Sequence, residues 1–115
     1  MKAVVNYILD NRYGLSVFFL AAIFLLPFLG MFPLIDPDEP VYGQTAREML
    51  AAGDWLSPRI YGNFWYDKPP LFYWLEMISY SLFGISDYTS RLPSAIMGLA
   101  TIGTVYIQCR AIFNK

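Results

Sequence analysis

The stretch GLSVFFLAAIFLLPFLGMFPLI, residues 14–35, contains no charged side chain. A helix needs roughly 20 apolar residues to cross a hydrocarbon core ~30 Å thick, and this stretch reaches that length. A cleaved signal peptide is the competing interpretation, but its apolar stretch would be only about 7–15 residues long and would end at a small-residue cleavage site. We therefore expect a retained transmembrane helix over residues 14–35, in which Pro27 is tolerated as a kink.

A second uncharged stretch, LPSAIMGLATIGTVYIQC, occupies residues 92–109. It is rich in Gly, Ala, Ser and Thr, which favour close packing of helices in membranes. Its length is sufficient for a second transmembrane helix. Together with the first stretch, it predicts an all-α membrane protein with two transmembrane helices.

The basic residues at the two ends of the chain predict its orientation. Lys2 and Arg12 precede the first expected span, and Arg110 and Lys115 follow the second. Cytoplasmic segments carry an excess of Lys and Arg, so we expect residues 1–13 and 110–115 in the cytoplasm, at the plasma (inner) membrane. The intervening residues 36–91 then form an extracytoplasmic loop.

The composition excludes several classes of protein. Of the 115 residues, 57% are hydrophobic and only 15% are charged, which is too apolar for a disordered chain or a typical soluble domain. Eight Lys and Arg stand against nine Asp and Glu, so no basic field is present for nucleic-acid binding. The single cysteine, Cys109, forms no intrachain disulfide, and the absence of histidine argues against a usual zinc site.

Two further helices are predicted in the extracytoplasmic loop. Apolar residues at helical spacing over residues 40–52, followed by Gly53, indicate a short amphipathic helix on the membrane surface. Residues 70–83 are apolar and aromatic but carry Glu76, and a third span there would put the C-terminal basic residues on the wrong side. We therefore expect a helix in the outer interface, and a re-entrant or packed helix is an alternative that explains the segment about equally well.

The candidate chemistry lies in two short stretches of the loop. In Asp36-Pro37-Asp38-Glu39-Pro40, two prolines stiffen a run of three carboxylates. Capping of the next helix explains one of these carboxylates but not the adjacent pair. Aromatic residues surround an acid and a lysine in the second stretch, YGNFWYDKPP (residues 61–70), a pattern typical of a sugar or phosphate site. Lys68 alternatively serves only as a snorkelling membrane anchor.

These motifs, in order and with family-like spacing, resemble the N-terminal region of the aminoarabinose transferase and protein O-mannosyltransferase-like membrane glycosyltransferases, which have the multi-span GT-C fold. The resemblance covers roughly residues 35–99. The motifs that carry it are the Asp36–Pro40 stretch with Tyr42, Ala46-Arg47-Glu48-Met49, Gly53-Asp54-Trp55, Pro58-Arg59, Lys68-Pro69-Pro70-Leu71, Tyr73-Trp74, Leu82-Phe83-Gly84 and Arg91-Leu92-Pro93-Ser94-Ala95.

The resemblance implies transfer of a sugar from a polyprenyl-phosphate donor to a lipid, glycan or protein acceptor on the outer face of the membrane, with inversion at the anomeric carbon. Asp38 matches the acid that activates or orients the attacking group, Glu39 supports that site or caps the helix, and Lys68 matches the lysine assigned to the donor phosphate. Pocket-lining positions are Tyr42, Arg59, Tyr66 and Asp67. Such chemistry needs a base and a positive charge, and Asp38 and Lys68 supply one of each.

Two departures from the family pattern bear on the site. Val41 stands where many relatives carry Arg, which removes a charge contact. Asp67, one methylene shorter, stands where relatives usually carry Glu, the position linked in some members to a divalent metal ion or to polar contacts. Asp67 is therefore the residue that such a metal would use.

Two spans alone do not enclose a pocket for a polyprenyl chain and a sugar. We therefore expect this chain to be the N-terminal piece of a longer transferase, inactive alone and dependent on the remaining spans of the full-length enzyme as well as on membrane lipid. The alternative hypothesis is a small non-enzymatic two-span membrane protein that binds a partner or a lipid headgroup.

Overall fold

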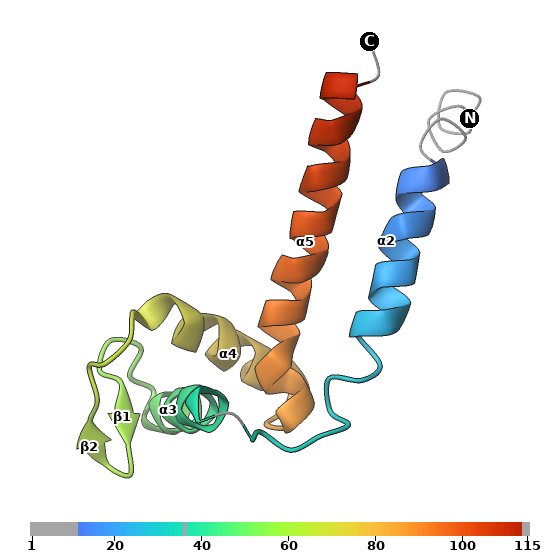
Figure 1. Ribbon diagram of the computed structural model, residues 1–115. Helices are drawn as coiled ribbons and strands as arrows, with labels where there is room; N and C mark the ends of the chain where they lie inside the picture. Colours follow the sequence, from blue (N-terminus) through green and yellow to red (C-terminus); the bar gives the residue numbers. More distant parts are fainter. Residues whose placement is uncertain (1–11, 36, 114–115) are drawn as a thin grey trace. The chain divides into compact units, whose positions relative to one another are not determined.

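The structure of the chain is a computed structural model that describes residues 12–35 and 37–113, and it is mostly helical (Figure 1). Its helices are α2 (Arg12–Leu25), α3 (Asp38–Ala52), α4 (Pro70–Phe83) and α5 (Asp87–Phe113). A two-stranded antiparallel hairpin, β1 (Arg59–Ile60) and β2 (Asn63–Phe64), lies between α3 and α4 in the chain. The chain divides into two compact units, one of residues 28–93 and one formed by the segments on either side of it.

The first expected span, residues 14–35, is helical only as far as Leu25. The N–H of Leu26 still donates to the Ala22 carbonyl at 2.9 Å, but Pro27 has no N–H and sterically disfavours helical geometry in the residue before it. Residues 26–35 form bends, turns and chain without regular secondary structure instead. The expectation of one kinked helix over residues 14–35 is therefore corrected to a helix that ends before the proline.

The second expected span lies within a longer helix. α5 runs over 27 residues, from Asp87 to Phe113, whereas the sequence predicted residues 92–109. Within the part of the chain that the structure describes, α5 is the one helix whose length and apolar composition suffice to cross a membrane, and α2 is a shorter apolar helix of 14 residues.

The start of α5 explains how a helix accommodates Pro93 in its seventh position. Ser86 and Thr89 form a reciprocal cap: the Thr89 N–H donates to Ser86 Oγ at 3.2 Å, and the Ser86 N–H donates to Thr89 Oγ1 at 2.9 Å. Pro93 removes the N–H that would have paired with the Thr89 carbonyl. Ser79 Oγ of α4 donates to that carbonyl at 2.7 Å, so the orphaned acceptor is satisfied from a neighbouring helix.

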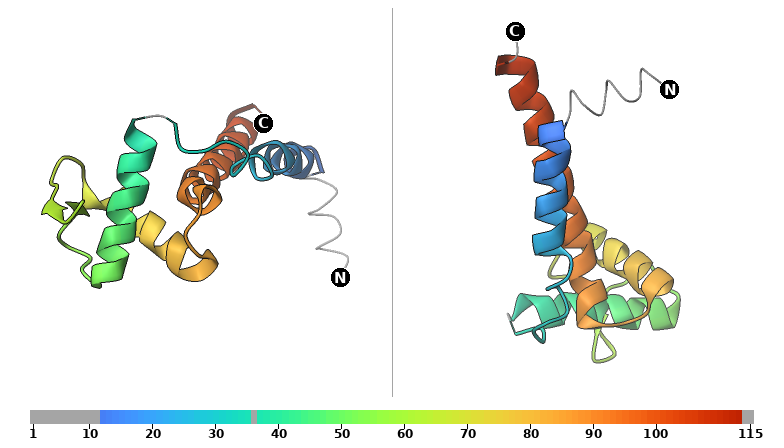
Figure 2. Two further views of the ribbon diagram at one scale, coloured as in Figure 1. Left: turned by 90° about the horizontal axis from the view of Figure 1, so that it is seen from below. Right: turned by 90° about the vertical axis from the view of Figure 1, so that its right-hand side faces the viewer.

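The core of residues 28–93 lies between α3 and α4, which cross one another as the two views of Figure 2 show. It consists of the buried side chains Ala46 and Met49 from α3, and Tyr73, Met77 and Tyr80 from α4. Glycine caps end both helices: Gly53 and Gly84 have φ of 65° and 84°, a conformation that costs glycine little. Pro70, in the first turn of α4, provides the fixed φ that favours helix initiation.

Gly43 permits the close approach of α3 to Tyr80 and Ser90. A Cβ at this position would lie 3.0 Å from Tyr80 Oη and 3.3 Å from Ser90 Oγ. Those two hydroxyls hydrogen bond to each other, and Tyr80 Oη also donates to the Gly43 carbonyl at 3.5 Å. The missing side chain is therefore what allows α3, α4 and the first turn of α5 to share one polar contact.

Candidate functional site

The structure brings together three charged residues that the sequence analysis selected. Lys68 Nζ lies 3.8 Å from Asp38 Oδ1 and 3.9 Å from Asp67 Oδ2. Asp38 and Lys68 are thirty positions apart in the chain, yet their side chains form an ion pair. The Asp38 side chain is 67% exposed and that of Lys68 is 33% exposed, so both remain open to a ligand.

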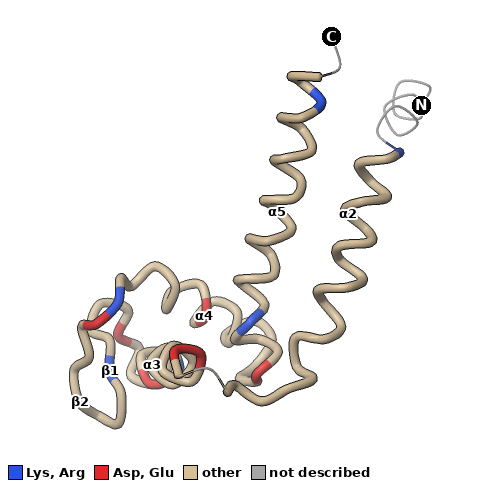
Figure 3. Tube along the Cα trace, in the orientation of Figure 1, with Lys and Arg blue, Asp and Glu red and all other residues tan. Residues whose placement is uncertain are grey.

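Helix packing places this pair. Asp38 is the first residue of α3, and Lys68 stands two residues before Pro70, the first residue of α4. The packing of α3 on α4 therefore sets where the two side chains meet. Figure 3 shows acidic and basic segments side by side at the start of α4 and acidic residues at the start of α3.

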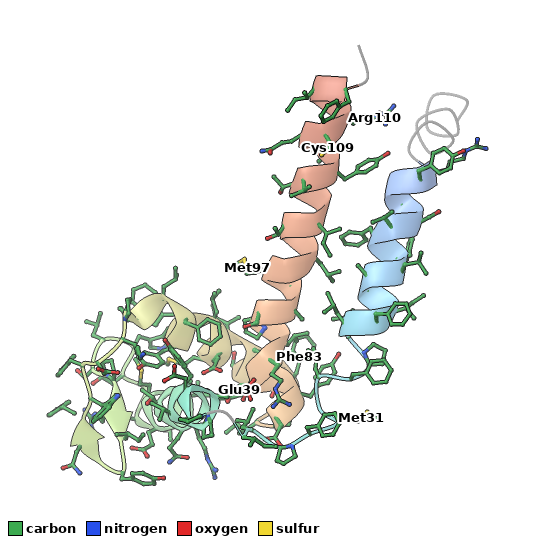
Figure 4. The ribbon with its side chains drawn as sticks, viewed as in Figure 1. Met31, Glu39, Phe83, Met97, Cys109 and Arg110 are labelled. Atoms are coloured by element: carbon green, nitrogen blue, oxygen red, sulfur yellow. The ribbon has the colours of Figure 1, made fainter. Side chains whose placement is uncertain are left out.

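Glu39, the neighbour of Asp38, has a separate partner. Its carboxylate accepts two hydrogen bonds from Arg91, at 3.0 Å from Nε and 2.7 Å from Nη2. This bidentate contact lowers the pKa of Glu39 and holds the residue ionised. Figure 4 labels Glu39 on α3. Glu39 thus points at the first turn of α5, whereas Asp38 points at Lys68.

Arg91 also binds the segment that precedes α3. Its guanidinium donates to the carbonyls of Leu29, Phe32 and Pro33, at 2.8, 2.6 and 3.0 Å. These carbonyls lie in the non-helical chain after α2, where no helix supplies N–H groups to them, so they need donors from elsewhere. The Arg91 side chain therefore supplies hydrogen-bond donors to the carbonyls of this loop and fixes the position of the chain where it enters α3. Arg91 belongs to the motifs that carry the family resemblance, but no role in the site was predicted for it.

The remaining predicted pocket residues fall into two groups. Tyr42 is half-buried, and its ring contacts Phe72 edge-on at 5.0 Å and Tyr73 at 5.3 Å between centroids. Arg59 pairs with Asp54 at 3.1 Å and lies over the Phe64 ring, which stacks on Tyr66 with centroids 6.0 Å apart. Tyr66 is 70% exposed. The second group, Arg59 and Tyr66, lies in and just after the hairpin, and the chain continues from there into Asp67 and Lys68.

Two acidic residues that were not selected from the sequence have defined places. Glu76 is 2% exposed on α4, and burial, together with the negative charge of Glu39, raises its pKa to about 8. Glu48 on α3 accepts backbone N–H groups from the hairpin turn, which lowers its pKa. A lone carboxylate inside an apolar helix was the available signal for Glu76. Glu48 was visible only as part of the motif Ala46-Arg47-Glu48-Met49, which did not indicate its contact with the hairpin.

The described residues do not form a metal site. Across residues 12–35 and 37–113, no three His, Cys, Asp or Glu side chains come close enough to hold an ion. The Asp67 carboxylate lies beside the ammonium of Lys68, which competes with a cation for it. The expectation of a metal at Asp67 therefore finds no supporting ligand set in this part of the chain.

Comparison with known proteins finds relatives of this chain. Residues 67–115 match the family model described as dolichyl-phosphate-mannose-protein mannosyltransferase. An undecaprenyl phosphate-alpha-4-amino-4-deoxy-L-arabinose arabinosyl transferase from Aeromonas salmonicida (strain A449) is 38% identical over 106 residues, which covers 87% of this chain and 19% of the relative. The transferase of the same name from Aeromonas hydrophila is 40% identical over 85 residues, 74% of this chain and 15% of that relative.

Solved structures of a transferase also match this chain. ArnT from Cupriavidus metallidurans bound to undecaprenyl phosphate matches 90% of this chain with a TM-score of 0.80 and 33% identity. This chain is a homologue of part of these transferases. The apo form of the same ArnT matches 98% of the chain with a TM-score of 0.71. The resemblance to the aminoarabinose transferase and protein O-mannosyltransferase-like glycosyltransferases is thereby confirmed, and the chain spans about a fifth of the length of the relatives that it matches.

Proposed function

We propose that this chain is the N-terminal part of an integral-membrane glycosyltransferase that moves a sugar from a polyprenyl-phosphate donor to a lipid, glycan or protein acceptor on the outer face of the membrane. The observation that carries the proposal is the ion pair between Asp38 and Lys68. Two groups with the charges that such a transfer needs lie 3.8 Å apart on an exposed part of the molecule. The donor class follows from the relatives, one of which was solved with undecaprenyl phosphate bound.

The chemistry assigns one step to each residue. An acceptor hydroxyl attacks the anomeric carbon from the face opposite the phosphate, a new carbon–oxygen bond forms, and the carbon–oxygen bond to the phosphate breaks with inversion. Asp38 accepts the proton of the attacking hydroxyl, a contribution of about 10²–10⁴-fold in general-base catalysis. Lys68 stabilises the negative charge that develops on the departing lipid phosphate.

Contact between Asp38 and Lys68 suits a site awaiting its donor. The donor phosphodiester carries one negative charge, and the departing lipid phosphate gains a second one as the bond to the sugar breaks, so the attraction of the Lys68 ammonium to the phosphate grows during the reaction. Asp38 then accepts the proton of the attacking hydroxyl. Glu39 contributes indirectly, because its pairing with Arg91 fixes the first turn of the helix that carries Asp38.

The membrane arrangement belongs to the same proposal. The apolar stretches around α2 and in α5 span the plasma (inner) membrane, residues 36–91 face outward, and α3 and α4 lie at the outer interface. In support, the described exposed side chains of α2 and of the later part of α5 are largely apolar. Further spans of a longer enzyme would complete the pocket for the polyprenyl chain.

The native protein in membranes of its source cell provides the test. Transfer from undecaprenyl-phosphate donors that carry aminoarabinose or mannose would be measured for Lys68→Ala, Asp38→Asn and the matched control Asp87→Asn. We expect both site variants to lose transfer by at least about 100-fold and the control to keep it.

The two site variants should also differ from each other. Binding of undecaprenyl phosphate should weaken in Lys68→Ala and persist in Asp38→Asn. Transfer at near-wild-type rates in both variants would refute the assignment. Donor binding without transfer in the wild-type protein would instead favour the lipid-binding alternative.

A further inference from the structure

The carboxylate of Glu48 joins α3 to the tip of the β-hairpin. Its Oε1 accepts the N–H of Tyr61 at 2.8 Å, and its Oε2 accepts the N–H of Gly62 at 3.0 Å. Gln44, one turn earlier on α3, donates to Oε1 at 2.6 Å. Both carboxylate oxygens are thus engaged, and the hydrogen bonds lower the pKa of Glu48, so the residue stays charged.

The hairpin turn needs such support. Ile60 pairs with Asn63, so Tyr61 and Gly62 form a two-residue turn, and their φ values of 52° and 79° are both positive. That combination is the signature of a type I′ turn, which favours Asn-Gly or Gly-Gly. Among the described residues, Tyr61 is the one non-glycine residue with positive φ. Tyr61 is therefore held in an unfavourable backbone conformation by the Glu48 carboxylate, which accepts the N–H groups of Tyr61 and Gly62.

The hairpin leads directly into the residues of the site. Beyond β2, the Trp65 N–H donates to the Pro58 carbonyl at 2.8 Å and extends the pairing towards Asp67 and Lys68. On the other side of Lys68, α4 is fixed to α3 by the buried core. Lys68 therefore stands between two attachments to α3: the core of α4 after it and the Glu48 contact before it.

We propose that Glu48 is a positioning residue for the donor site, which holds Lys68 opposite Asp38 by fixing the hairpin on α3. This role rests on the proposed function, because it concerns the binding of the donor phosphate by Lys68. Glu48 contacts the backbone of the hairpin turn and acts on Lys68 through the backbone of residues 58–68.

The first test follows backbone hydrogen exchange in the full-length native protein. Glu48→Gln keeps the side-chain volume but removes the charge and turns one acceptor oxygen into a donor that faces an N–H group. We expect faster exchange over residues 58–66 and unchanged exchange over α4, with Arg47→Gln, its exposed neighbour on α3, as the matched control. Equal exchange in Glu48→Gln and wild type would overturn the proposal.

The second test separates positioning from general stability. In Glu48→Gln, the KM for the undecaprenyl-phosphate-linked donor should rise about tenfold, with kcat changed much less, because the ground-state position of Lys68 is what loosens. Gln44→Ala removes one donor to Glu48 and should act in the same direction to a smaller extent, so the test survives poor accumulation of Glu48→Gln. A loosened hairpin with an unchanged donor KM would overturn the proposal.

A rescue variant provides the sharpest discrimination. Asn adopts the left-handed conformation readily, so Tyr61→Asn stabilises the type I′ turn from within. Added to Glu48→Gln, it should return both the exchange over residues 58–66 and the donor KM towards wild-type values. Failure of this rescue would show that Glu48 acts by another route. Absence of transfer in the wild-type protein would overturn the proposed function and this role with it, while the exchange contrast would still report on the anchor itself.

Discussion

The unit of residues 28–93 and the unit that holds α2 and the later part of α5 differ in how far their large apolar side chains are buried. In residues 28–93, large side chains such as Tyr73 and Met77 are fully buried, and the charged groups form ion pairs and hydrogen-bond networks. In the other unit, Ala95 and Leu99 are the buried apolar residues of the described part, whereas Phe24 is 71% and Ile107 67% exposed.

Charge separates the two units in the same way. Arg12 and Arg110 are the charged residues in the described part of the apolar unit, and both stand near helix ends, as Figure 3 shows. In hydrocarbon, apolar side chains have no drive to bury, whereas backbone polar groups must be satisfied within the helix. Apolar composition therefore distinguishes the unit that holds α2, whereas specific packing sets the geometry of residues 28–93.

Truncation of a methionine in each unit gives the largest contrast. Met77→Ala should destabilise residues 28–93 by about 2–5 kcal/mol, because it opens a cavity in a fully buried position. Met97→Ala, at a position that is 54% exposed on α5 (Figure 4), should change stability by less than about 0.5 kcal/mol. Denaturant unfolding in detergent checks both, and equal losses would show that the two units are packed alike.

The pH dependence of stability tests the buried carboxyl of Glu76. Its pKa in the folded state is about 8, above the ordinary value of 4.5, so the folded protein holds a proton that the unfolded chain releases. This contribution is fully present below pH 4.5 and is lost as the pH rises to about 8, on the order of a few kcal/mol.

Glu76→Gln removes that titration. Melting temperatures between pH 5 and 8 should therefore fall less steeply in Glu76→Gln than in the wild-type protein. Half-buried Asp87 on α5, changed to Asn, serves as the control and should leave the slope as it is. Parallel slopes in wild type and Glu76→Gln would contradict the burial of this carboxyl.

Arg91→Ala tests the polar network that joins the loop, α3 and α5. Loss of the guanidinium leaves Glu39 and the carbonyls of residues 29, 32 and 33 without their donors, at a cost of about 1.5–3 kcal/mol. Arg91→Lys should restore little of this loss, because an ammonium does not reproduce the planar fork. Thermal unfolding checks the prediction, with the exposed Arg47→Ala as the control. An Arg91→Ala variant as stable as the wild-type protein would contradict the network.

Ser79→Ala should give the smallest effect, about 1 kcal/mol. The variant leaves the Thr89 carbonyl, already deprived of a helical donor by Pro93, without a partner. The matched control is Ser81→Ala on the same helix, where the exposed hydroxyl donates to the Ile78 carbonyl. Addition of Pro93→Ala should cancel the loss caused by Ser79→Ala, and a loss that persists in the double variant would show that Ser79 stabilises by another contact.

Local signals in the sequence predicted much of the helical structure and failed where distant residues meet. The segment expected as a helix over residues 70–83 has those bounds in α4, because Pro70 and Gly84 act within one turn. α3 begins at Asp38, two residues before the expected position. The hairpin at residues 59–64 was not anticipated, because its turn depends on the distant Glu48 rather than on a favourable turn sequence.

The site divides along the same line. The sequence shows the types of residue that a sugar transfer needs, a carboxylate at position 38 and an ammonium at position 68. The roles of these two residues in the transfer stay predictions. Their separation of 3.8 Å, the diversion of Glu39 to Arg91 and the burial of Glu76 depend on contacts between segments up to 52 positions apart.

The amino-acid sequence by itself determined that this chain is apolar and helical, where helix-breaking and capping residues stand, and which family it resembles, because hydropathy and backbone geometry act over a few neighbouring residues. Only the tertiary structure decided which carboxylate faces Lys68, which one Arg91 binds and which one is buried. Chemically similar acids acquire these different environments from the elements that pack around them, and that packing is a property of the whole unit rather than of any one stretch.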